Sequence, residues 1–128
     1  MIYILDTNII SAARRADRSP NVATWLAAQA ETDLFLSVIT LGEIERGIHL
    51  QESRNPEFAL DLRRWLDRTV TLFADRILAF TAQDARLWGE LSARLGHPGV
   101  DLMIAAQALA RNAQGVPRNV ADFGPSDG

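Results

Sequence analysis

The stretch from Leu102 to Ala110 constrains the fold more than any other part of this sequence. Every residue in it except Gln107 is apolar. A helix that is apolar nearly all round does not face water on any side, and it is buried between other layers of the structure. We therefore expect this segment to be a helix that other elements cover on more than one side.

Short apolar runs elsewhere predict the strands that such a helix can pack against. Residues 2–5 (IYIL) and 34–39 (LFLSVI) are typical of buried strands, and residues 69–73 (TVTLF) favour a third, short one. The tail after residue 111 is typical of a loop and leaves room for only a very short strand.

Helical patterns separate these runs and carry clear start and stop signals. Serine-proline and asparagine-proline pairs begin two of the helices. Thr81 and Asp84 form a capping-box pattern with aspartate in place of glutamate, and Gly96 marks the end of that helix. The helices are expected at residues 19–30, 41–50, 55–68, 81–95 and 101–110. Alternating strands and helices predict one α/β domain, residues 1–128, with a small parallel sheet.

The composition excludes several kinds of chemistry. The 128 residues include 48% hydrophobic residues, which is enough for a core, and no cysteine, so disulfides and thiolate metal sites are absent. All 13 basic residues are arginine, so no mechanism that needs a lysine operates in this chain. The sequence has no run of about 18 apolar residues and no secretory signal, and we expect a cytoplasmic protein.

Four carboxylates lie where surface charge does not explain them. Asp6 follows the first strand, Glu43 follows the second, Asp101 begins the apolar helix, and Asp122 lies between two apolar residues of the tail. Each alone is also compatible with a helix cap or a turn. All four, however, follow a strand or begin a helix, and the carboxyl ends of parallel strands share one edge of a sheet, where ligands bind.

Gathering four carboxylates is costly because like charges repel, and a divalent cation removes that cost. Oxygen ligands of this kind suit Mg²⁺ or Mn²⁺. The two histidines, His49 and His97, are isolated in the sequence and do not indicate zinc. A bound ion of this type can activate water and stabilise a phosphoryl transition state, so the residues indicate a metal-dependent phosphoryl enzyme.

Four blocks of the sequence resemble, in order and spacing, the PIN-domain ribonucleases. The resemblance is closer still to the VapC-type toxins of bacterial type II toxin–antitoxin systems. The resemblance runs over essentially the whole chain, and four blocks carry it: DTNIISAA at 6–13, SVITLGEIERG at 37–47, DLMIAAQALA at 101–110 and RNVADF at 118–123.

The resemblance implies a three-layer α/β/α sandwich and an endoribonuclease that uses Mg²⁺ or Mn²⁺ and cuts RNA, transfer RNA among the candidates. It implies a homodimer and a cognate antitoxin that covers the acidic site. By motif position the catalytic and metal-binding residues are Asp6, Glu43, Asp101 and Asp122. Residues expected to hold the carboxylates by hydrogen bonds are Thr7, Asn8, Thr40 and Asn119. Arginines expected to contact phosphate are Arg14, Arg15 and Arg118.

Three other functions compete with this one. A phosphoryl-accepting receiver domain has a similar size and acidic site, but it depends on a lysine that this chain lacks. A non-catalytic PIN-like module that binds antitoxin or RNA stays open, because Pro117 stands where relatives carry threonine. A DNA-directed nuclease of the same fold also stays open, because carboxylate and metal chemistry does not distinguish the two backbones.

Overall fold

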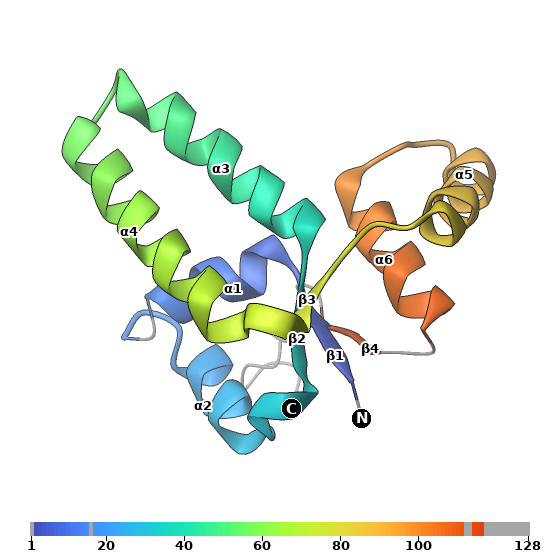
Figure 1. Cartoon of the computed structure of the whole chain (residues 1–128), viewed down its shortest axis with the longest axis horizontal. Helices are drawn as coiled ribbons and strands as arrows, with labels where there is room; N and C mark the ends of the chain where they lie inside the picture. The colour runs from blue at the N-terminus through green and yellow to red at the C-terminus, as the bar shows by residue number, and fades with distance from the viewer. Residues whose placement is uncertain (1, 16, 112–113, 117–128) are drawn as a thin grey trace.

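A central parallel sheet organises the computed structural model, which describes residues 2–15, 17–111 and 114–116. Within these residues the sheet has four strands in the order β3-β2-β1-β4, all parallel (Figure 1). The strands are β1 (Tyr3–Leu5), β2 (Leu34–Ser37), β3 (Ile77–Leu78) and β4 (Gln114–Val116). The small parallel sheet expected from the sequence is therefore confirmed.

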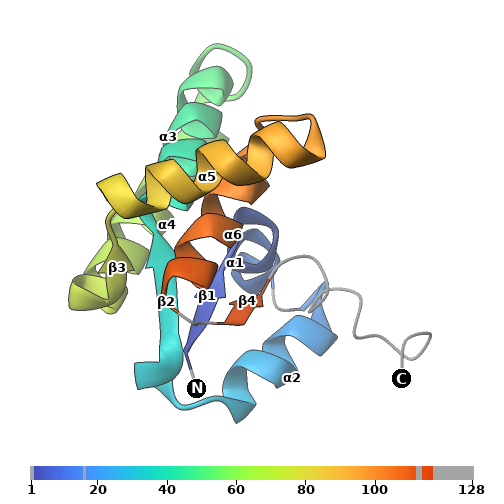
Figure 2. The same ribbon diagram turned by 90° about the vertical axis from the view of Figure 1, so that its right-hand side faces the viewer.

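Helices cover both faces of this sheet. On one side lie α1 (Thr7–Arg14), α2 (Pro20–Ala28), α3 (Val38–Glu52) and α4 (Pro56–Phe73), and on the other lie α5 (Ala82–Leu95) and α6 (Val100–Ala110) (Figures 1 and 2). Successive residues of β1 point to opposite faces, as the two-residue period of a strand requires. Leu5 packs into the core cluster of α1–α4, whereas Ile4 packs against Ile104 and Ala108 of α6. This is the expected α/β/α sandwich.

The apolar helix α6 lies between α5 and the sheet (Figure 1). Five of its residues are buried: Leu102, Ile104, Ala106, Gln107 and Ala108. The buried Gln107 donates from Nε2 to the carbonyl of Ala79 at 3.0 Å, which ties the helix to the segment after β3. Leu109 is the exception to the expected burial, because it is 60% exposed.

The strand expected at residues 69–73 is wrong, since these residues are the last turns of α4. Their β-favouring composition is outweighed by the buried face of the helix, where Ala59, Leu66, Thr69 and Phe73 recur at helical spacing. The hydroxyl of Thr69 also donates to the carbonyl of Trp65, four residues earlier, at 2.8 Å. The strand that does follow α4 is β3, only two residues long, and the sequence did not indicate it.

Local signals set most of the helix boundaries. Thr81 and Asp84 form the expected capping box, and Gly96 ends α5 in the left-handed conformation with φ of 79°. Asn55 accepts a hydrogen bond from the amide of Phe58 and begins α4, whereas Ser19 makes no side-chain cap bond at α2. The second strand stops at Ser37, two residues earlier than expected, because this serine caps α3. No helix in the described ranges is long and apolar enough to cross a membrane.

The path of the chain through the sheet makes the end of β1 the candidate place for a ligand site. From β1 the chain moves to β2 and β3 on one side, and it returns through α5 and α6 to β4 on the other. The strand order therefore reverses at β1. In open parallel sheets ligands bind outside the carboxyl ends of the strands at such a reversal, and Asp6 is the first residue after that end of β1.

Candidate active site

Asp6 is held where β1 ends and α1 begins. It is the N-cap of α1, and its Oδ1 accepts a hydrogen bond from the amide of Ile9 at 3.0 Å. Aspartate is among the preferred N-cap residues because its short side chain reaches these amides, and the helix N-terminus favours its negative charge. The cap therefore fixes a half-buried carboxylate at the strand reversal of the sheet.

Glu43 is linked to the start of α1 by Thr7, the residue after Asp6. The hydroxyl of Thr7 donates to Glu43 Oε1 in a hydrogen bond that links residues 36 positions apart. Glu43 reaches this place because Ser37 starts α3 at the end of β2, which leaves the glutamate half-buried in the second turn of the helix. The bond therefore connects the beginning of α1 with the beginning of α3.

Thr40 lies one helical turn before Glu43 and is fully buried. Its hydroxyl has no hydrogen-bond partner within the described part of the chain. A buried hydroxyl without a partner costs about 1–3 kcal/mol, so such groups are few in folded proteins. Thr40 thus places an uncompensated polar group one turn from Glu43. Asn8, by contrast, is exposed on the first turn of α1.

The third acid, Asp101, is exposed in the first turn of α6. Its carboxylate lies over Gly99, the N-cap residue, because a Cβ built at that glycine would meet Asp101 Oδ1 at 2.6 Å. The remaining residues expected at the site, Asp122 and Asn119, and the expected phosphate contact Arg118, lie outside the described residues.

The described carboxylates do not form a complete ligand set as they are placed. Among residues 2–15, 17–111 and 114–116, no three acidic or histidine side chains are close enough to hold a metal ion. The structure joins Thr7 to Glu43 but does not bring Asp6, Glu43 and Asp101 together. Their chemistry still fits a hard cation, because all three offer carboxylate oxygens, the ligands that Mg²⁺ and Mn²⁺ prefer.

A cavity of about 240 Å³ begins at the Thr7–Glu43 bond. It lies where α1, α3 and α4 meet, and the sequence did not indicate it as a unit. Its lining follows helical spacing on each helix, which is the signal that could have revealed it. The residues that line it are Thr7, Ser11, Arg14, Arg15, Glu43, Ile44, Gly47, Phe58, Leu62 and Trp65.

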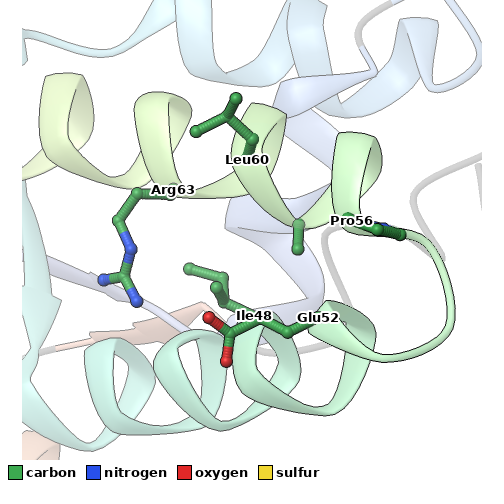
Figure 3. Close-up of a pocket in the computed structure, with 6 residues that line it drawn as sticks. Ile48, Glu52, Pro56, Leu60 and Arg63 are labelled. Atoms are coloured by element: carbon green, nitrogen blue, oxygen red, sulfur yellow. The ribbon is translucent and has the colours of Figure 1, made fainter.

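A second, larger pocket of about 410 Å³ lies between α3 and α4 and contains none of the expected acids. Figure 3 shows that Ile48 and Glu52 come from α3 on one side of the pocket, and that Leu60 and Arg63 come from α4 on the other. Arg63 donates to Glu45 Oε1 at 2.6 Å and holds the pKa of that carboxyl below its usual range. This ion pair is a link between the two helices, and it uses no residue of the candidate site.

Comparison with known proteins agrees with this fold. A family model described as the PIN domain matches residues 3–119, and the chain belongs to the PIN-domain family. Within the family it is similar to VapC-type ribonucleases. It is 39% identical to Ribonuclease VapC14 of Mycobacterium tuberculosis over 102 residues, which cover 80% of this chain and 93% of that protein.

The chain is also similar to a named toxin and to solved complexes of such toxins. Toxin FitB of Neisseria gonorrhoeae is 30% identical over 114 residues, 88% of this chain and 81% of that protein. The crystal structure of FitAcB from the same organism superposes with a TM-score of 0.79 at 28% identity, and 94% of each chain is covered. VapBC2 of Rickettsia felis, bound to a promoter DNA fragment, superposes with a TM-score of 0.68 at 28% identity, covering 94% and 89%. The VapC-type resemblance read from the four sequence blocks is confirmed.

Proposed function

We propose that this chain is a VapC-type toxin, an endoribonuclease that hydrolyses RNA phosphodiester bonds with the help of Mg²⁺ or Mn²⁺. The observation that carries the proposal is the hydrogen bond from Thr7 to Glu43. It joins the block that begins with Asp6 to the block that contains the glutamate, at the carboxyl end of β1. Transfer RNA is a candidate substrate.

The ion would be held by the carboxylates of Asp6, Glu43 and Asp101, with Asp122 as the fourth. When bound, such an ion orients a water molecule, lowers its pKa and stabilises charge on the transition state. The protein's own groups keep the ligands in place. The amide of Ile9 fixes Asp6, and the hydroxyl of Thr7 fixes Glu43.

Three further polar residues complete this assignment. The buried hydroxyl of Thr40 offers a donor one turn before Glu43. Asn8 and Asn119 are assigned to the same supporting role. Groups of this kind orient metal ligands and are worth about 10–100-fold in metal affinity or activity.

A cognate antitoxin is the partner that fits this assignment. FitAcB and VapBC2 are toxin–antitoxin complexes, and the second was solved on DNA from its promoter. In this proposal the chain is a single PIN domain over residues 1–128 that forms a homodimer in the cytoplasm. The antitoxin covers the acidic site and keeps the nuclease inactive until it is removed.

Cleavage of total cellular RNA by the purified chain tests the proposal directly. The reaction is run with Mg²⁺, with Mn²⁺ and with EDTA, beside Asp6→Asn and Glu43→Gln. Asparagine keeps the N-cap of α1, so loss of cleavage in that variant is not a loss of folding. Asp61→Asn, an exposed acid on α4, is the matched control.

Discrete fragments that require metal, disappear in both site variants and persist in the control would support the nuclease. If the well-folded protein loaded with metal cuts no RNA, the non-catalytic PIN-like module becomes the better assignment. Cleavage of DNA but not RNA would instead assign the site to a DNA-directed nuclease.

A further inference from the structure

The cavity where α1, α3 and α4 meet connects the candidate active site to a pair of arginines. Thr7, Ser11 and Arg14 are spaced so that they share one face of α1. Along the helix axis the seven steps from Thr7 to Arg14 span about 10 Å. One end of the cavity is therefore the Thr7–Glu43 bond, and the other end is positively charged.

The two arginines at that end are available to an anion. Within the described part of the chain, neither Arg14 nor Arg15 forms a salt bridge, whereas Arg63, Arg76 and Arg111 do. Arg14 instead lies over the ring of Phe58, with its guanidinium carbon 5.3 Å from the ring centroid. An aromatic face holds a cation in position without neutralising it, so Arg14 is oriented at the cavity while its charge is kept.

Apart from Ser11, the wall of the cavity between these two ends is apolar, and the cavity is limited in size. Ile44, Leu62 and Trp65 line it, all of them half-buried or buried, and at Gly47 an added Cβ would meet nothing within 4 Å. Ligand sites for drug-sized molecules measure about 300–1,000 Å³. The smaller volume of about 240 Å³ suits one sugar or base together with its phosphate. Aromatic side chains such as Trp65 are the usual stacking partners of single-stranded bases.

We propose that this cavity is a subsite for the nucleotide next to the cleaved bond of a single-stranded RNA segment. Arg14 and Arg15 bind the phosphate that neighbours the one at the acidic site. The apolar wall of Leu62 and Trp65 receives the attached sugar or base. This inference rests on the proposed nuclease function for its orientation, and it adds the residues that hold the substrate on one side of the cut.

RNA binding without catalysis tests the subsite. A short fluorescein-labelled single-stranded RNA of mixed sequence is titrated with the full chain in EDTA, and fluorescence anisotropy is followed at several salt concentrations. Arg14→Gln and Arg15→Gln are compared with Arg64→Gln, an exposed arginine on α4 that does not line the cavity. Arg14→Lys keeps the charge, and far-UV circular dichroism checks the folding of each variant.

The expected result is specific to the two cavity arginines. Each glutamine variant weakens binding by roughly five- to tenfold, as loss of one charge-assisted contact to phosphate does. Each also reduces the slope of log K against log salt by about 0.7, the value for one single-strand phosphate contact. Arg14→Lys retains most of the salt slope, and Arg64→Gln behaves like the original chain.

The experiment distinguishes failure of the proposed subsite from failure of the proposed nuclease activity. If the original chain binds no RNA, or if the cavity variants bind it unchanged, the subsite is wrong even when metal-dependent cleavage is observed. If binding depends on Arg14 and Arg15 but no RNA is cut, the subsite stands and the proposed hydrolysis fails. If the variants still bind RNA but no longer bind an acidic partner protein, the cavity belongs to a protein interface and the inference is overturned.

Discussion

The ion pair between Arg111 and Asp84 offers a sharp test of how α6 is fixed in the fold. Arg111 Nη1 lies 2.8 Å from Asp84 Oδ1, and Nη2 lies 3.0 Å from Oδ2. The Asp84 side chain is 1% exposed and that of Arg111 is 25% exposed. Nη2 also donates to the carbonyl of Ala79 at 3.3 Å. One guanidinium therefore ties the end of α6 to the start of α5 and to the segment after β3.

Arg111→Met removes this guanidinium and leaves a buried carboxylate without its cation. Breaking a buried ion pair in this way costs about 3–5 kcal/mol. We expect about 3 kcal/mol, the low end, because Arg111 is a quarter exposed and Asp84 still accepts from the amide of Thr81 at 2.8 Å. For a chain of this length that loss lowers Tm by roughly 12 °C.

The double variant Asp84→Asn/Arg111→Met separates the buried charge from the lost packing. Asparagine keeps an acceptor for Thr81 but carries no charge. The double variant should therefore recover at least half of the stability that Arg111→Met loses. Urea denaturation followed by circular dichroism measures all three proteins. A loss below about 1 kcal/mol for Arg111→Met, or a double variant no more stable than it, would refute the reasoning.

The pH dependence of the same pair has a defined sign. The Arg111 guanidinium, followed by the Thr81 hydrogen bonds, lowers the pKa of Asp84 below its ordinary value of 3.8. The stability that this carboxylate contributes is therefore fully present above that value and is lost as pH falls through the lower folded pKa. The difference between the original chain and Arg111→Met should shrink below about pH 4. A difference that stays constant to lower pH would contradict the assignment.

Three smaller changes test single contacts. Asn55→Ala removes the acceptor that Phe58 N uses at 3.2 Å, and it should cost about 1 kcal/mol in urea denaturation; a neutral result would mean that packing alone starts α4. Ala74→Gly relieves the positive φ of 43° at the end of α4, and it should raise stability by about 0.5–1 kcal/mol in urea denaturation. A loss of stability would mean that Ala74 is not strained at this angle. Thr7→Val removes the hydroxyl that holds Glu43. It should weaken Mn²⁺ binding, measured by calorimetry, by about 10–100-fold with little change in Tm. An unchanged Mn²⁺ affinity would exclude the role of Thr7 in holding this ligand.

Local signals in the sequence were sufficient where one short segment decides the structure. The capping box at Thr81, the cap at Asn55 and the stop at Gly96 were predicted because each depends on hydrogen bonds or backbone angles within a few residues. The burial of α6 followed from composition, since a helix with so little polar surface has few other places to lie. The place of Asp6 at the end of β1 followed from the run of apolar residues before it.

Tertiary structure decided everything that depends on which helix faces which. Residues 69–73 became helical because Phe73 completes a buried stripe along α4, and their β-favouring composition counted for less. The bond between Thr7 and Glu43 joins residues 36 positions apart, and the cavity beside it is lined from α1, α3 and α4. The sequence motifs predicted Thr7 and Glu43 as site residues. Only packing could place them in contact, because the distance between two helices depends on all the side chains that lie between them and the sheet.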